Sequence, residues 1–258
     1  MLTDMRSGLG NMLSGVGAAS ILLKKTVVSL FKRKLEWKNT LDQILFIGTN
    51  SVPLVLLSGF FTGMVLALQT GETFRSVFNE PIYVGLAVGY SMILELGPVL
   101  TSIVVTGRAG AAMTAEIGTM KVTEQIDALH TLGTEPVTYI LVPRFLAFII
   151  ALPLLVVFAD CAGIFGGLIV AIYKLGIPFS KYWDEITEME ISDLMHGFIK
   201  SGFFAVIIAW VCCYNGLETS GGAEGVGKST TRAVVTAMVM ILVTDYFLSS
   251  LLISMGIG

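Results

Sequence analysis

Five long apolar stretches limit what this chain can fold into more than any other feature. A helix rises about 1.5 Å per residue, so about 20 apolar residues cross the ~30 Å hydrocarbon core of a bilayer. The stretches that reach this length are 44–68, 82–105, 145–173, 194–214 and 233–257. Only 14% of the 258 residues are charged, against about 25% in an ordinary soluble domain. The sequence therefore predicts one all-α integral membrane domain, residues 1–258, with about five transmembrane helices.

The segment before the first stretch, residues 9–38, has a different pattern. It is moderately apolar, but Lys24 and Lys25 interrupt it, and a basic run from Lys32 to Lys34 follows. This combination is typical of an amphipathic helix that lies in the membrane interface, with its cationic side towards anionic head groups. A sixth span is the alternative, and the paired lysines argue against it.

Basic residues in the connecting segments predict the orientation of the spans, because cytoplasmic loops carry an excess of Lys and Arg. With five spans and the N-terminus inside, 12 of the 16 Lys and Arg residues fall on the cytoplasmic side. The other four are Arg75, Lys174, Lys181 and Lys200. We therefore expect a cytoplasmic N-terminus and a C-terminus on the outer side.

Neither metal binding nor nucleic-acid binding is expected. The three cysteines lie inside apolar runs, and His130 and His196 lie in separate segments without metal-ligand neighbours. The basic residues are few and lie near the membrane borders.

Small residues recur inside the apolar stretches. They include Gly59 and Gly63, Gly85 and Gly89, and the group Gly163, Gly166 and Gly167. Small residues let helix backbones approach closely in lipid. We therefore expect close helix contacts at these positions, as part of ordinary bundle packing.

Residues 222–229 read GAEGVGKS and match the phosphate-binding pattern G-x-x-x-x-G-K-[ST]. That pattern cradles a nucleotide only where a β-strand leads in and a helix leads out of the loop. Here one predicted span precedes the run and another follows it. We interpret the run as a glycine-rich cytoplasmic turn, so that if the protein uses ATP, another chain must bind it.

The polar segment between the second and third spans, residues 97–144, is the richest in motifs. Residues 116–131 predict a short amphipathic helix that Gly133 and Pro136 end. Such a helix on the cytoplasmic side suits docking in the groove of a partner protein. A connector packed under its own bundle is the alternative.

Several runs in and around this segment carry a resemblance to a known family. They are Glu95-Leu-Gly-Pro, Gly107-Arg-Ala-Gly, Thr114-Ala-Glu-Ile-Gly-Thr-Met, Glu124-Gln-Ile-Asp-Ala-Leu, Pro143-Arg, Thr230-Thr-Arg-Ala-Val-Val and Asp245-Tyr-Phe-Leu. Together they resemble the MlaE permease family, over residues 40–256. The members of this family are the membrane subunits of ABC transporters that work with MCE proteins.

The resemblance implies phospholipid transport between the inner membrane and the outer envelope, which helps maintain outer-membrane lipid asymmetry. It implies a homodimer of permeases in a bacterial inner membrane of the Gram-negative type, with ABC ATPase subunits docked on the cytoplasmic helix. It also implies a periplasmic hexamer of MCE-domain proteins and, in some systems, a STAS-like cytoplasmic subunit. ATP and Mg would then bind in the partner ATPase, and this chain, a non-catalytic subunit, would bind no cofactor.

Charged residues inside the apolar stretches need a reason, because a charge at bilayer depth costs about 2.5–3.5 kcal/mol on insertion scales. Glu95 matches a family glutamate near the lipid cavity, and Lys200 matches a basic family position. Members of the family can carry an arginine just before that glutamate, where this chain has Leu94. We expect Lys200 to offer a cation to a lipid phosphate or to neutralise Glu95 or another acid. For Asp160 and Asp245 we expect hydrogen bonds within the bundle.

The expected mechanism is lipid transfer through a cavity in the dimer. The residues assigned to lipid binding and translocation are Glu95, Lys200, Gln69, Leu66, Leu68, Val99 and Asp245. The residues assigned to coupling with the ATPase are Glu116, Glu124, Gln125, Ile126, Asp127 and Leu129. ATP binding in the partner would bring the two cytoplasmic helices together and reshape the cavity.

Two other classes of protein stay open at this point. A stand-alone channel or secondary transporter needs a polar path through the spans, and five spans without an internal repeat offer few candidates. A membrane-embedded enzyme needs a catalytic pair, for which Asp160 and Asp245 are the only candidates.

Overall fold

A computed structural model describes residues 17–30, 36–78 and 83–257. The described part is helical and contains no strand, which confirms the predicted all-α class. A first helix covers residues 17–30. In the labels of the other elements, η marks a π-helix. They are α2 (Trp37–Gly48), α3 (Val52–Phe78), α4 (Val84–Tyr90), η1 (Ser91–Leu96), α5 (Gly97–Val105), η2 (Thr106–Gly110), α6 (Ala111–Val122), α7 (Gln125–Thr131), η3 (Val137–Leu141), α8 (Val142–Tyr173), α9 (Phe179–Thr187), α10 (Ile191–Leu217) and α11 (Gly222–Ser254).

Five helical stretches of the described chain are long and apolar enough to cross a membrane. They are Trp37–Val77, Val84–Val122, Val137–Tyr173, Ile191–Leu217 and Gly222–Ser254. Each overlaps one predicted span but most extend well beyond it, since helical hydrogen bonding continues past the apolar core of a span. The last stretch begins at Gly222, so the whole run 222–229 is the first part of a helix rather than a turn.

The helix predicted over 116–131 is two helices in the structure. Helix α6 continues the second span to Val122, and α7 begins at Gln125. Between them Glu124 takes a left-handed conformation with φ 59°, which interrupts the helical hydrogen bonds and changes the chain direction. The prediction of one continuous helix was therefore wrong, because the sequence has no Gly or Pro at the break.

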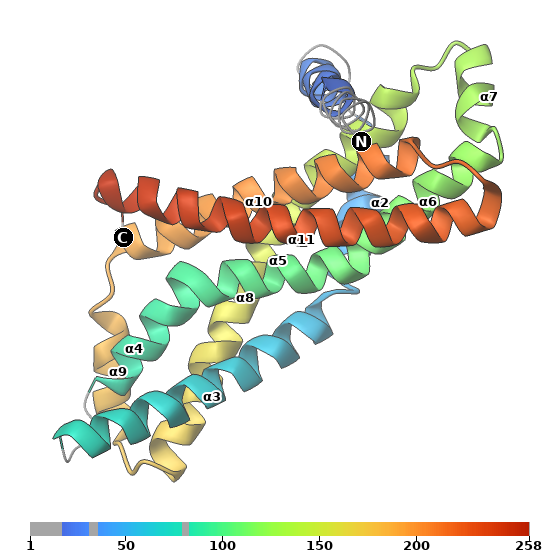
Figure 1. Cartoon of the computed structure of the whole chain (residues 1–258). Coiled ribbons are helices and arrows are strands. Elements are labelled where there is room, and N and C mark those ends of the chain that lie inside the picture. The colour runs from blue at the N-terminus through green and yellow to red at the C-terminus, as the bar shows by residue number, and fades with distance from the viewer. Residues whose placement is uncertain (1–16, 31–35, 79–82, 258) are drawn as a thin grey trace, which may run out of the picture.

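The helices form two packed groups that share α8 (Figure 1). Helices α10 and α11 lie side by side and antiparallel, with α5 and α6 against them. Helix α3 packs along α8, and the C-terminal end of α3 lies farther from α11 than its N-terminal end does. One hydrophobic core lies between α6, α8 and α10, and a smaller one lies between α3, α4, α8 and α9.

Glycines set the close contact between α3 and α8. A Cβ atom on Gly63 would lie 1.9 Å from the Gly163 carbonyl oxygen, and one on Gly166 would lie 2.2 Å from the Phe60 carbonyl oxygen. Gly59 likewise faces the backbone of Ala159. The two backbones therefore touch, as the small residues predict.

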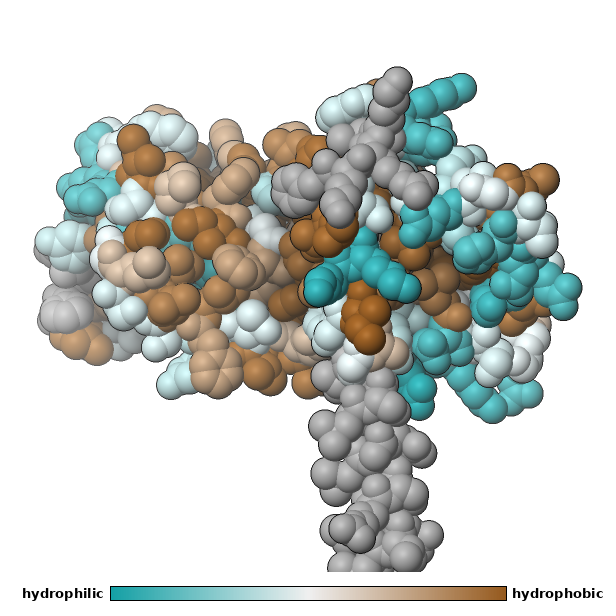
Figure 2. Space-filling model, turned by 90° about the horizontal axis from the view of Figure 1, so that it is seen from above, coloured by the Kyte–Doolittle hydropathy of each residue, from teal (hydrophilic) through white to brown (hydrophobic). Residues whose placement is uncertain are grey.

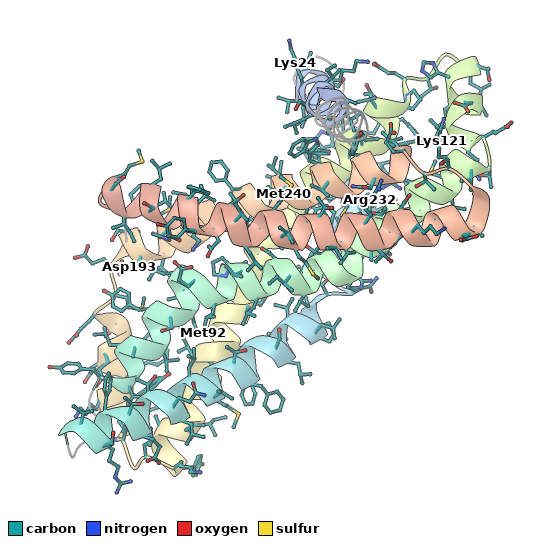
Figure 3. The ribbon with its side chains drawn as sticks, in the orientation of Figure 1. Lys24, Met92, Lys121, Asp193, Arg232 and Met240 are labelled. Atoms are coloured by element: carbon teal, nitrogen blue, oxygen red, sulfur yellow. The ribbon has the colours of Figure 1, made fainter. Side chains whose placement is uncertain are left out.

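The helix over residues 17–30 lies against the C-terminal part of α10 and runs across it. Figure 1 views it along its axis, whereas α10 and α11 run across the page. The Trp210 Nε1 group of α10 donates a hydrogen bond to the Ala19 carbonyl oxygen at 2.8 Å. Lys24 and Lys25 are exposed, and Lys24 points away from the bundle (Figure 3). The interfacial position of this helix stays a prediction, and residues 9–16 and 31–35 of the predicted segment 9–38 lie outside the described part.

Helix α9 fastens the opposite end of the molecule, beside α4 (Figure 1). The buried Glu185 carboxylate accepts hydrogen bonds from the backbone N–H groups of Gly85 at 2.7 Å and Leu86 at 3.4 Å. These N–H groups begin α4 and have no partner within that helix. The Tyr182 hydroxyl donates to the Ile164 carbonyl oxygen at 3.0 Å. Burial, and then the nearby Glu185 carboxylate, raise the pKa of Tyr182 above its ordinary value.

The surface separates by polarity along the molecule. Figure 2 shows hydrophobic residues over the middle, and many hydrophilic residues at the end that carries α6 and α7. This pattern is what a chain that crosses a bilayer requires, with its polar ends in water.

Candidate functional site

A buried lysine joins three elements of the bundle. The Lys200 ammonium of α10 lies 2.7 Å from Glu95 Oε2 of η1 and 2.5 Å from Asp245 Oδ1 of α11. It also donates to the Leu94 carbonyl oxygen at 3.0 Å and to Ser249 Oγ at 2.9 Å. Ser249 Oγ in turn lies 2.9 Å from Glu95 Oε1. We call Glu95, Lys200, Asp245 and Ser249 the charged cluster.

A proline explains why the Leu94 carbonyl oxygen is available to Lys200. In an α-helix that oxygen would accept a hydrogen bond from the N–H four residues later. Residue 98 is Pro98, which has no N–H to donate. The chain responds with the π-helix η1, in which the Gly97 N–H bonds instead to the Met92 carbonyl oxygen. Such π-helical turns occur frequently at functional sites.

Two spacings in α10 and α11 bring the other groups into reach. Gly197 of α10 faces η1 so closely that a Cβ atom there would lie 2.2 Å from the Ile93 carbonyl oxygen. Lys200 follows three residues later, on a neighbouring part of the same helix face. Asp245 and Ser249 are one helical turn apart on α11, so their side chains lie on one face. The sequence thus builds the cluster from local helix geometry.

Exposure within the cluster is uneven. The Lys200 side chain is 0% exposed, whereas Glu95 is 45% and Asp245 is 20% exposed. The cation is therefore internal, and the carboxyl groups form the outer face. A carboxylate that faces outward at bilayer depth is costly against acyl chains, so the Glu95 side of the cluster has to meet a polar space or a partner.

The cluster contains three of the seven residues that the sequence assigned to lipid. We expected Lys200 either to bind a lipid phosphate or to neutralise Glu95 or another acid. The structure shows the second arrangement, in which Lys200 pairs with both Glu95 and Asp245. Of the other four, Leu66 and Leu68 of α3 pack against the smaller core, and Gln69 of α3 is exposed. Val99 of α5, about one helical turn after Glu95, packs against the larger core.

Asp160 and Asp245, the candidate pair for a membrane enzyme, have different neighbours. Asp245 belongs to the charged cluster. Asp160 of α8 faces Gly97, where a Cβ atom would lie 1.8 Å from Asp160 Oδ1. Asp245 is paired with Lys200, whereas Asp160 Oδ1 is buried without a hydrogen-bond partner in the described part of the chain. The hydrogen bond that we expected for Asp160 within the bundle is therefore absent at this atom.

Helix α7 turns its apolar side inward. Ile126 is buried in the larger core, and Leu129 packs against that core. Glu124, Gln125 and Asp127 are exposed, and Asp127 lies 3.5 Å from Lys121 of α6; Figure 3 places Lys121 near the turn between these helices. Of the six predicted coupling residues, the exposed ones are available to a partner, whereas Ile126 and Leu129 hold α7 on its own bundle.

Glu116, the sixth predicted coupling residue, forms an ion pair that was not foreseen. Its carboxylate lies 2.9 Å from Arg144 Nη2 of α8, and Arg144 is almost fully buried. Arg144 Nη1 also donates to the Ile140 carbonyl oxygen at 2.8 Å. This pair ties the end of the second span to the start of the third.

Sequence reasoning missed three members of these networks. Ser249 carries a usable signal, since it follows Asp245 by one helical turn. The Leu94 carbonyl oxygen is signalled by Pro98, which removes its usual donor. Arg144 gives no comparable signal, because a basic residue at a span border ordinarily indicates contact with head groups.

The fold and the cluster define a multi-pass membrane protein with a charged site inside its helix bundle. The model of the family described as Permease MlaE matches residues 40–251. The chain therefore belongs to the MlaE permease family, as the motifs predicted.

Relatives match over nearly the whole chain. A probable ABC transporter permease protein of Rickettsia bellii is 39% identical over 97% of this chain and 98% of its own length. The intermembrane phospholipid transport system permease protein MlaE of Haemophilus influenzae is 34% identical over 99% of this chain and 100% of its own. The chloroplastic protein TRIGALACTOSYLDIACYLGLYCEROL 1 of Arabidopsis thaliana is 39% identical over 89% of this chain and 66% of its own.

Proposed function

We propose that this chain is the membrane subunit of an ATP-driven transporter that moves phospholipid between the inner membrane and the outer envelope. The observation that carries the proposal is the half-exposed Glu95 carboxylate, held by the buried Lys200 inside a membrane bundle. The name of the Haemophilus influenzae relative supports phospholipid as the substrate. In an outer-membrane organism this activity helps maintain lipid asymmetry.

The position of the charged cluster fits a lipid head group drawn into the bundle. Lys200 lies nine residues beyond the start of α10 at Ile191, and Asp245 lies nine residues before the end of α11 at Ser254. At about 1.5 Å per residue, each is about 14 Å along its helix from that end. In Figure 3, Asp193 lies near this end of the α10–α11 pair and Arg232 lies towards the other. A head group bound at the cluster is thus well inside the membrane.

A second copy of the chain would close the space in front of the cluster. Next to Asp245, α11 exposes Val239, Val243, Tyr246 and Phe247. These side chains leave one face of α11 uncovered in a single copy. A homodimer that packs on this face would exclude bulk lipid from Glu95 and create a shared cavity, with acyl chains against apolar walls.

The end that carries α6 and α7 suits the ATPase. It is the polar end in Figure 2, and α7 presents Glu124, Gln125, Asp127 and the 79% exposed Leu132. We place this end and the N-terminus in the cytoplasm, and the C-terminus in the periplasm with a hexamer of MCE-domain proteins. ATP and Mg bind in the ATPase, and a STAS-like subunit completes the cytoplasmic side in some systems.

Affinity purification from the native host in mild detergent tests the proposal, with mass spectrometry of the proteins and lipids that co-purify. We expect an ABC ATPase, an MCE-domain protein and phospholipid. Recovery of the chain alone, folded and without an ATPase, would instead favour a stand-alone transporter.

A further inference from the structure

Lys200 has no capacity left for a ligand. An ammonium group has three N–H donors, and Lys200 uses them on the Leu94 carbonyl oxygen, Glu95 and Ser249. Asp245 Oδ1 also lies 2.5 Å from the ammonium as an ion-pair partner. The Lys200 side chain is also 0% exposed. A buried lysine beside a lipid path would ordinarily suggest a phosphate site. Here a lipid phosphate that reached the cluster would meet no free cation.

The face that a ligand can reach is acidic. The Glu95 side chain is 45% exposed and the Asp245 side chain is 20% exposed. The cluster contains two carboxyl groups and only one lysine. The formal charge is −1 when both carboxyl groups are ionised, and zero when the two hold one proton. In neither state is the cluster positive, so it attracts cations or is neutral towards charge.

No other lysine or arginine lies close to the cluster along the three elements that form it. The histidine one helical turn before Lys200, His196, is buried, and its Nδ1 lies 2.8 Å from the Ile257 carbonyl oxygen. On the second span, the next lysine or arginine after Glu95 is Arg108, thirteen residues later. On α11, the nearest one to Asp245 is Arg232, thirteen residues earlier. Both are about 20 Å along the helix axis from the cluster. Helix α10 contains no other Lys or Arg.

We propose that the charged cluster recognises the ammonium group of a phospholipid head group and thereby favours aminophospholipids over anionic lipids. The inference rests on the proposed function and specifies its substrate class. The ammonium would pair with the exposed Glu95 carboxylate and supply the second positive charge that the cluster lacks. A head group with N–H donors, such as ethanolamine, gains charge-assisted hydrogen bonds that a quaternary choline cannot form.

The test measures which lipids the purified permease complex retains from a defined mixture. The complex is exchanged into mixed micelles of phosphatidylethanolamine, phosphatidylcholine and phosphatidylglycerol at equal amounts, and bound lipid is quantified by mass spectrometry. Because a partly exposed ion pair contributes up to about 1 kcal/mol, we expect about fivefold enrichment of phosphatidylethanolamine over phosphatidylglycerol. Phosphatidylcholine should fall between them.

Glu95→Gln is the matching variant, since it keeps the size of the side chain and one acceptor oxygen and removes its charge. We expect the ratio of phosphatidylethanolamine to phosphatidylglycerol to fall towards one. Glu188→Gln, at an exposed carboxylate just after α9, is the control and should keep the wild-type ratio. Equal retention of all three lipids by the wild type, or enrichment of phosphatidylglycerol, would overturn the head-group inference alone. Retention of no phospholipid would overturn the proposed function as well.

Discussion

At the scale of single residues, Lys200 is the group on which the site depends. Burying a lysine is costly unless acids and other acceptors surround it, and here Glu95, Asp245, Ser249 and one carbonyl oxygen do so. Removing the cation leaves two carboxyl groups facing each other at bilayer depth. Removing one acid still leaves the cation paired with the other.

Lys200→Met should therefore destabilise the protein more than Glu95→Gln does. We expect a loss of about 3 kcal/mol, the lower end of the range for breaking a buried pair, because Glu95 is half exposed. The measurement is the thermal unfolding of the purified protein in detergent. A triple variant that adds Glu95→Gln and Asp245→Asn should recover most of the lost stability. Equal melting temperatures for Lys200→Met and the wild type would show that the ion pairs contribute little.

Sequence reasoning reached part of this cluster and not its arrangement. Glu95 and Lys200 are conspicuous because charges are rare in apolar stretches. The ion pairs that join Lys200 to both Glu95 and Asp245 depend on how α10 and α11 pack against η1. The apolar pattern of the spans does not predict the register of that packing. The carbonyl oxygen of Leu94 belongs to the backbone, so only the effect of Pro98 on the helix reveals it.

At the scale of elements, two kinds of contact fix the helices. Backbones touch where glycines face each other, as in α3 and α8. Elsewhere side chains satisfy the free ends of helices, as Glu185 does for α4. These contacts hold α4 and η1, and therefore Glu95, relative to the rest of the bundle.

Gly63→Ala tests the backbone contact. Because the new methyl group would lie 1.9 Å from the Gly163 carbonyl oxygen, α3 and α8 have to separate. Overpacking of this kind costs about 1–3 kcal/mol, which chemical or thermal unfolding in detergent would detect. Gly202→Ala is the control, since nothing lies within 4 Å of a Cβ atom there, and in a helix the alanine should be neutral or stabilising. Equal stability of the two variants would contradict the close α3–α8 contact.

Glu185→Ala tests the cap on α4. Loss of a side chain that caps a helix costs about 1–2 kcal/mol, and the first N–H groups of α4 lose their acceptor. Hydrogen exchange should therefore become faster at residues 84–90, with little change in α11. Glu188→Ala removes an exposed acid just after α9, the helix that contains Glu185, and should leave hydrogen exchange at residues 84–90 unchanged. Unaltered exchange in Glu185→Ala would mean that the cap is not needed.

At the scale of the whole molecule, the charged cluster lies in the half of the α10–α11 pair where α10 begins and α11 ends. Helix α7 lies at the other end of that pair (Figure 1). The second span, Val84–Val122, connects them, since it contains Glu95 and ends beside α7. A movement of α7 imposed by a partner therefore has a direct helical route to the cluster. The break at Glu124 and the ion pair between Glu116 and Arg144 lie on that route.

Charge reversal at Asp127 should weaken docking of the ATPase without unfolding the permease. Asp127 is 62% exposed and its ion pair with Lys121 is a surface pair, so its loss costs little stability. We expect about tenfold less ATPase to co-purify with Asp127→Lys, as for loss of a contact worth about 1.4 kcal/mol. Asp184→Lys, at an exposed acid of α9, is the control. Normal ATPase recovery with Asp127→Lys would move the docking surface away from α7.

The sequence predicts the overall architecture better than its details. Apolar length alone locates the five spans, because the bilayer demands it. The extension of the second span to Val122 is not visible, since polar residues beyond the membrane continue the helix without changing the apolar pattern. The inward face of α7 is also missed, because Ile126 and Leu129 have the same spacing whether they meet a partner or their own core.

The most direct test of the central claim is ATP-dependent movement of phospholipid by the purified complex reconstituted in vesicles. The account predicts that labelled phosphatidylethanolamine leaves the vesicles for an acceptor, or enters from it, only when hydrolysable ATP is present. It also predicts that Lys200→Met abolishes this movement in complexes that still contain the ATPase. Transfer at the same rate without ATP, or ATP-driven transfer that Lys200→Met leaves intact, would contradict the account.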